Sequence, residues 1–78
     1  MYLHIGNDKM IRSEDVLIIL NHNILNMTEN KKWLKATSLS QPVSHEAVIK
    51  DTKPRSIVVT DNKIYFSTIN PETIAGRG

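Results

Sequence analysis

Cysteine is absent from the 78-residue sequence, and glycine and aromatic residues are scarce. Without cysteine the chain forms neither disulfides nor thiolate–metal sites, which is typical of a reducing compartment. Its three glycines, at 6, 76 and 78, match neither a phosphate-binding loop nor a nucleophile elbow. No apolar run approaches the roughly 20 residues that span a bilayer, and the start lacks a signal-peptide pattern. We therefore expect a cytoplasmic protein without membrane contact.

The sequence also lacks any recognisable pattern of catalytic or metal-binding side chains. His4, His22 and His45 stand apart from one another and from carboxylates at metal-binding spacing. A Ser-His-Asp triad has no fixed spacing along a chain, but no motif here indicates one. We expect no enzyme activity, no metal or cofactor and no small-molecule substrate. The remaining class is a protein that binds a macromolecule.

The short length predicts a single domain over residues 1–78, because typical domains have about 100–150 residues. Scaffolds of this size usually gain stability from disulfides, a metal or self-association. The unbroken apolar run at 16–20 is typical of a strand covered on both faces, which so short a chain can hardly achieve alone. We therefore expect a homo-oligomer with Val16, Ile18 and Ile19 at the interface.

Short β-favouring runs alternate with turn residues along the chain. Residues 2–5 and 10–12 flank the turn-forming cluster Gly6-Asn7-Asp8, which predicts a hairpin. Residues 56–60 and 63–67 flank Asp61-Asn62, which predicts a tighter hairpin, since both residues tolerate positive φ. A further brief strand is predicted at 47–49.

One central helix is predicted over about residues 28–39. Asn26 and Glu29 have the three-residue spacing of a capping box at its start. Trp33 and Leu34 are the expected anchors of this helix to the core.

A second, short helix is predicted at the end of the chain. Asn70-Pro71-Glu72 provides a capping side chain, a proline at the first helical position and a carboxylate in the first turn. The helix is expected to end near Gly76. The predicted fold class is α+β, with a small, mostly antiparallel sheet, one central helix and a short C-terminal helix.

Basic residues are concentrated in the later part of the chain. Residues 1–30 carry two basic and four acidic residues, whereas 31–78 carry eight basic and four acidic. Lys50, Lys53 and Arg55 surround a turn that a proline stiffens. Cations on a rigid loop lose little side-chain entropy on contacting phosphate, so these three are candidate nucleic-acid contacts. A solvated turn is the alternative interpretation.

Several segments resemble a known family. MYLHIG at 1–6, SIVVT at 56–60, IYFS at 64–67 and PETIA at 71–75 resemble the bacterial extracellular matrix regulatory proteins of the RemA/RemB type, most closely RemB. The region 21–51 matches poorly. The resemblance implies a small cytoplasmic regulator in Firmicutes-like bacteria. RemA-type members are DNA-binding activators of biofilm matrix genes that assemble into rings.

Two functions remain open after comparison with the RemA-type pattern. That pattern has an arginine before the first apolar strand and a run of arginines before the later one. Lys53 and Arg55 match two of the later positions, whereas Thr52 and Asp15 replace basic residues. The leading hypothesis is an oligomeric DNA-binding transcriptional regulator. The alternative is an oligomeric module that binds a regulatory protein, which Asp15 favours because a carboxylate repels phosphate.

Overall fold

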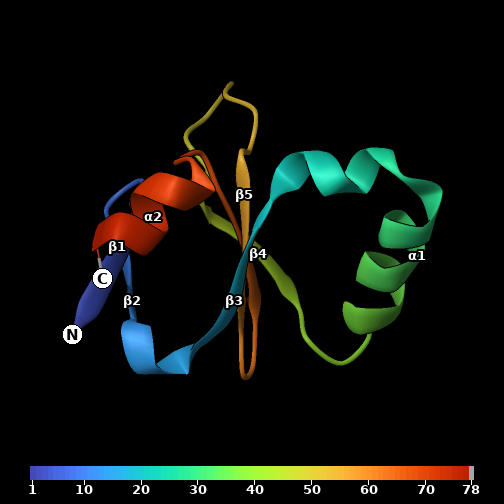
Figure 1. The fold of residues 1–78 in the computed structure, drawn as a ribbon, viewed down its shortest axis with the longest axis horizontal. Coiled ribbons are helices and arrows are strands. Elements are labelled where there is room, and N and C mark those ends of the chain that lie inside the picture. The colour runs from blue at the N-terminus through green and yellow to red at the C-terminus, as the bar shows by residue number, and fades with distance from the viewer. Residues whose placement is uncertain (78) are drawn as a thin grey trace.

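A four-stranded sheet forms the centre of the computed structural model, which describes residues 1–77 (Figure 1). Its strands are β3 (Val16–Asn21), β4 (Val43–Ala47), β5 (Ser56–Thr60) and β6 (Ile64–Ser67). The order across the sheet is β3-β5-β6-β4. The β3–β5 and β5–β6 pairs are antiparallel, whereas β4 runs parallel to β6. The mostly antiparallel sheet is confirmed, and β3 and β4 are its edges.

A separate hairpin, β1 (Tyr2–Gly6) and β2 (Lys9–Arg12), packs on one face of this sheet. Its turn has positive φ at Asn7 and Asp8, 50° and 60°, as the turn residues predicted. Gly6 has φ +114°, and a Cβ there would lie only 2.8 Å from the carbonyl oxygen of Ala47. Glycine is therefore required where the hairpin approaches β4.

Helices complete the two layers that enclose the sheet. They are the 3-10 helices η1 (Ser13–Asp15) and η2 (His22–Asn26), and the α-helices α1 (Thr28–Thr37) and α2 (Pro71–Arg77). Figure 1 shows the sheet between the β1–β2 hairpin with α2 on the left and α1 on the right. The predicted α+β class, with a central and a short C-terminal helix, is confirmed.

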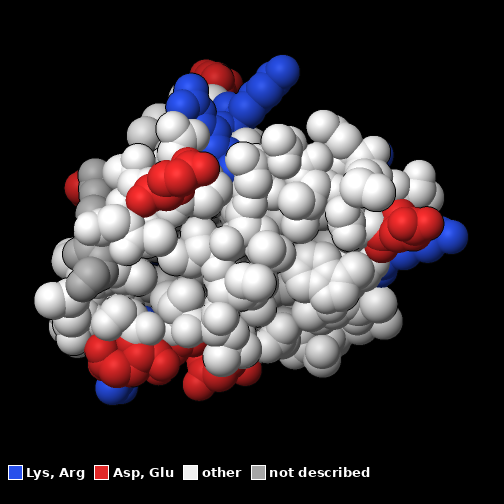
Figure 2. Space-filling view, in the orientation of Figure 1, with Lys and Arg blue, Asp and Glu red and all other residues white. Residues whose placement is uncertain are grey.

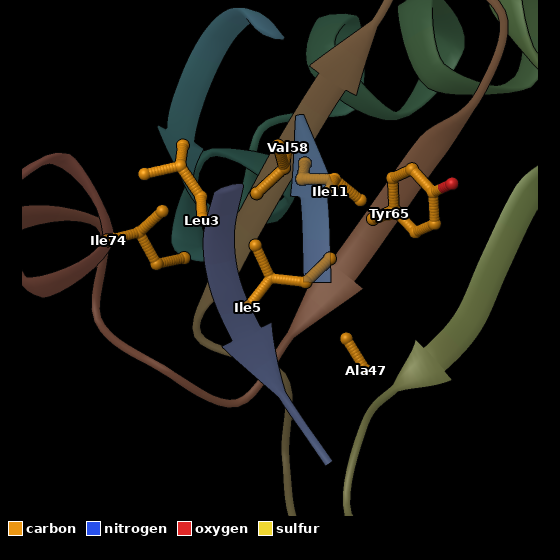
Figure 3. Packing of buried hydrophobic residues seen from close by; sticks show 7 residues of the cluster. All are labelled: Leu3, Ile5, Ile11, Ala47, Val58, Tyr65 and Ile74. Carbon is orange, nitrogen blue, oxygen red and sulfur yellow. The ribbon is translucent and has the colours of Figure 1, made fainter. Parts of the chain in front are cut away.

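The larger core cluster lies under the hairpin and α2. It brings together buried side chains from six elements, Leu3, Ile5, Ile11, Ala47, Val58, Tyr65 and Ile74 (Figure 3). Val16 and Ile19 of β3 are half-buried against it. Each buried aliphatic side chain contributes about 1.5–3 kcal/mol, so this cluster fixes the hairpin and α2 to the sheet.

A smaller cluster of Ile57, Val59 and Ile64 lies on the opposite face, under η2 and α1. Leu34 of α1 packs against it, as the sequence predicted. Trp33 is not among the side chains packed against this cluster, and it is 36% exposed. The prediction of Trp33 as a core anchor is therefore wrong.

The start of α1 also differs from the prediction. Asn26 belongs to η2, and the N-cap residue is Met27, whose side chain makes no capping hydrogen bond. The predicted capping box of Asn26 and Glu29 is therefore wrong. Asn30 Nδ2 instead donates a hydrogen bond to the carbonyl of Ile24 at 2.8 Å, which joins η2 to α1.

β4 lies earlier in the sequence than the strand predicted at 47–49. β4 ends at Ala47, which pairs with Ser67 of β6, so the predicted strand at 47–49 is wrong. The N–H of Val48 turns back and donates to the carbonyl of His45 at 3.0 Å. This bond ends the strand and starts the loop to β5.

The β5–β6 hairpin is confirmed, but its turn works differently from the prediction. Neither Asp61 nor Asn62 has positive φ. The Thr60 hydroxyl instead donates to the carbonyl of Lys63 at 2.8 Å and accepts from the N–H of Lys63 at 3.0 Å. A side chain at the end of β5 therefore closes the turn.

Glu14 of η1 accepts hydrogen bonds from Ser13, from the terminal ammonium of Met1 and from Arg12. These bonds, led by that of Ser13, lower the pKa of Glu14 from 4.5 to about 2. A carboxyl group with a lowered pKa in the folded state stabilises the fold above its unfolded pKa, and this stabilisation is lost as pH falls. Glu14→Gln is therefore expected to flatten the decline of unfolding free energy between pH 4.5 and 2, measured by urea unfolding.

The matched control for this experiment is Glu29→Gln, which changes an exposed carboxylate in the first turn of α1. No ion pair of Glu29 occurs among the side chains of residues 1–76. Equal pH dependence in the two variants would contradict the role assigned to Glu14.

Candidate nucleic-acid interface

The segment 48–55, here termed the basic loop, connects β4 to β5 and carries the predicted contacts Lys50, Lys53 and Arg55. All three side chains are exposed. Within the described residues 1–77, none of them forms an ion pair with a carboxylate. Basic side chains gather over this loop at the top of Figure 2. The structure therefore brings the three sequence-predicted cations together at one end of the sheet.

Hydrogen bonds within the basic loop hold its backbone in place. The N–H of Thr52 donates to the carbonyl of Ile49 at 3.1 Å, and the Thr52 hydroxyl bonds to the same oxygen. Asp51, between them, has φ of 65°, in the left-handed region that aspartate tolerates. The loop thus presents Lys50 and Lys53 from a defined turn.

Arg55 is the most firmly placed cation, because its backbone bonds to both neighbouring segments. Its N–H donates to the carbonyl of Ser67 at 2.7 Å, and its carbonyl accepts from the N–H of His22 at 2.9 Å. The guanidinium Nη1 donates to Asn70 Oδ1 at 3.4 Å. Arg55 therefore lies where β5 enters the sheet, with its charge oriented by Asn70.

Asp15, the position at which the RemA-type pattern has an arginine, lies at the other end of the sheet. Val16 pairs with Thr60, whereas Asn21 pairs with Ser56, which directly follows Arg55. Five residue steps along a strand correspond to roughly 17 Å. The carbonyl of Asp15 accepts from the N–H of Asp61, and acidic groups gather at the bottom of Figure 2. In one subunit Asp15 is thus separated from the basic loop.

The predicted interface residues on β3 fall into two groups. Val16 and Ile19 are half-buried against the core of their own chain. Ile18 is 48% exposed, and Leu17, not singled out from the sequence, is 67% exposed at an irregularity in the β3–β5 pairing. The expectation that one face of this strand needs covering from outside the chain therefore rests on Leu17 and Ile18.

A shallow polar depression beside Arg55 was not predicted. It is lined by Asn21, His22, Asn23, Asn26, Pro54, Arg55 and Asn70. The rings of His22 and His45 flank Phe66, with centroids 5.0 and 5.1 Å from its own. Burial lowers the pKa of His22, which favours the neutral ring.

Two other kinds of feature, a metal centre and a membrane-spanning helix, are absent from residues 1–77. No three histidine, aspartate or glutamate side chains there are grouped so that they could hold a metal ion. No helix in the same range has the length and apolar character needed to cross a membrane.

Comparison with known proteins decides the family. Residues 2–77 match the model of the RemA-like family, described as extracellular matrix regulatory protein A-like. The chain belongs to this RemA-like family. No match was found among the curated proteins. The family identifies a regulator of the extracellular matrix and confirms the RemA/RemB resemblance at family level, without distinguishing the RemB type.

Proposed function

We propose that this RemA-like chain is a DNA-binding transcriptional regulator that acts as a homo-oligomer in the cytoplasm. The basic loop is the observation that carries the proposal. It presents Lys50, Lys53 and Arg55 together, exposed and without a carboxylate partner among the described residues, on a backbone fixed by hydrogen bonds. Such cations release counterions on contacting phosphate, which supplies most of the sequence-independent affinity for DNA.

Self-association strengthens these contacts, because one subunit offers only a few cations. Linked sites bind with an effective concentration that multiplies weak affinities, so an oligomer engages several phosphates along one duplex. The edge strand β3 exposes Leu17 and Ile18, and an exposed apolar edge favours pairing with another chain. A second copy of this chain is the proposed occupant, and a ring is one assembly that this contact permits.

The alternative function is an oligomeric module that binds a regulatory protein rather than DNA, and Asp15 is the residue that favours it. Its carboxylate would repel phosphate at a position where the RemA-type pattern has an arginine. In one subunit, however, Asp15 and Arg55 lie at opposite ends of the β3–β5 pair. Phosphate bound at the basic loop is therefore remote from that carboxylate, and we favour DNA.

A gel-shift titration with random-sequence duplex DNA at two salt concentrations tests the proposal, on protein whose mass in solution is measured by light scattering. Binding is expected at low salt, with log affinity falling by about 0.9 per phosphate contact for each unit of log salt. An intact oligomer that shifts no DNA even at low salt would contradict DNA binding and favour the protein-binding module.

A further inference from the structure

The polar depression beside the basic loop is lined mainly by asparagine side chains. Four of its lining residues carry side-chain amides: Asn21, Asn23, Asn26 and Asn70. Arg55 is its only fully charged residue, and no carboxylate lines it. A polyanion bound at the basic loop would therefore meet hydrogen-bonding groups here without repulsion.

Two of the four amides are already engaged within the chain. Asn21 Oδ1 caps η2 by accepting from the N–H of Asn23 at 3.0 Å, and Asn70 Oδ1 accepts from Arg55 at 3.4 Å. The other two, on Asn23 and Asn26, are exposed and form no side-chain hydrogen bond among residues 1–76, whose side chains the structure describes. Each therefore offers both a carbonyl acceptor and an NH₂ donor to a ligand.

The backbone beneath Asn23 and Asn26 is tied to the basic loop and to α1. The N–H of His22 donates to the carbonyl of Arg55 at 2.9 Å, and Asn30 Nδ2 donates to the carbonyl of Ile24 at 2.8 Å. These bonds hold η2 at its first residue, His22, and at its middle residue, Ile24. The backbone that carries Asn23 and Asn26 is thus fixed relative to the backbone of Arg55, one of the cations that we assign to phosphate contact.

An amide with both groups free matches the edge of a base better than a phosphate. Asparagine pairs in a bidentate manner with N6 and N7 of adenine in the major groove, whereas a phosphate offers acceptors alone. Contacts to phosphate fix the position of a protein on DNA but carry no sequence information. The basic loop alone would therefore give binding without sequence preference.

We infer that Asn23 and Asn26 read base edges in the major groove, with adenine the expected base, while the basic loop holds the adjacent backbone. The inference rests on the proposed DNA binding and extends it, since it assigns sequence preference to η2. Burial lowers the pKa of His22, which disfavours a further positive charge on this surface.

The experiment first selects duplexes that the wild-type oligomer enriches from a random library. Affinities for an enriched and a scrambled duplex are then measured for wild type, Asn23→Ala, Asn26→Ala and the double variant. Each variant is expected to reduce the ratio of the two affinities by about fivefold to a hundredfold, because one bidentate amide–base pair discriminates by that factor. Affinity for the scrambled duplex and its salt dependence are expected to stay unchanged.

Asn62→Ala is the control, because it removes an exposed amide from the turn at the opposite end of the sheet, where Asn62 Oδ1 accepts from the Thr60 hydroxyl at 3.3 Å. It is expected to leave the ratio at the wild-type value, and thermal melting confirms that all variants fold. An unchanged ratio in the η2 variants, equal loss on both duplexes or no enriched sequence would each overturn base reading by η2 while DNA binding stands. Wild type that binds no duplex at all would instead overturn the proposed function.

Discussion

Lys53→Ala and Arg55→Ala are each expected to weaken DNA binding roughly tenfold to a hundredfold, since a hydrogen bond to a charged group contributes about 1.5–3 kcal/mol. Both side chains are exposed on the basic loop and unpaired with any carboxylate in residues 1–77, so their removal leaves the core intact. Each lost phosphate contact also lowers the salt slope by about 0.9. Fluorescence anisotropy titrations at several salt concentrations measure affinity and slope together.

Lys63→Ala is the control for net charge, because Lys63 carries the same charge beside the turn at the other end of the sheet. A loss equal to that of Lys53→Ala would show that overall charge, and not the basic loop, determines binding.

Asp15→Arg adds a cation at that same distant end. It is expected to strengthen binding and steepen the salt slope if a neighbouring subunit brings this end to the duplex.

Local sequence signals were sufficient for the two hairpins. Gly6, Asn7 and Asp8 adopt the positive φ of the first turn through their own backbone preferences, and the bond from Asn7 Nδ2 to the carbonyl of Glu46 at 3.0 Å adds a contact to β4. The second hairpin was also placed correctly, although Thr60 and Lys63 close its turn in place of the expected positive φ. A strong pair of flanking strands therefore predicted the hairpin even where the assumed turn chemistry was wrong.

The region between the hairpins was predicted less well, because long-range contacts decide it. β4 is a strand through its parallel pairing with β6, some twenty residues later, and nothing in VSHEA itself indicates this partner. Trp33 illustrates the same difficulty on α1. Its size suggested a core position, whereas the short helix contacts the sheet through Leu34.

The candidate site likewise has one part that the sequence could predict and one part that it could not. Lys50, Lys53 and Arg55 are close in sequence, so their grouping could be predicted from charge and the intervening proline. The amides of Asn23 and Asn26 could not be connected to them, because η2 reaches the basic loop only through the register of β3 with β5. A site assembled by strand pairing has no signature in the spacing of its residues.

Ile18→Asp is expected to dissociate the oligomer without unfolding the subunit, whereas Ile19→Asp is expected to unfold it. Ile18 is 48% exposed on the edge strand, so an aspartate there stays hydrated in the free chain but is buried at the proposed contact between copies. Ile19 packs against the core under the hairpin, where an unpaired carboxylate costs several kcal/mol. Light scattering coupled to size exclusion measures the mass, and thermal melting measures the fold.

Ile49→Asp provides the matched control, since Ile49 is also 48% exposed but lies on the basic loop and not on β3. It is expected to keep the mass of the wild-type oligomer, because the same change in hydrophobicity then falls outside the contact. A wild-type mass near 8.9 kDa at every concentration would contradict self-association itself. An unchanged mass in Ile18→Asp beside an oligomeric wild type would instead place the contact away from this edge. The partner copy would then cover a different surface, and some other molecule would have to cover Leu17 and Ile18.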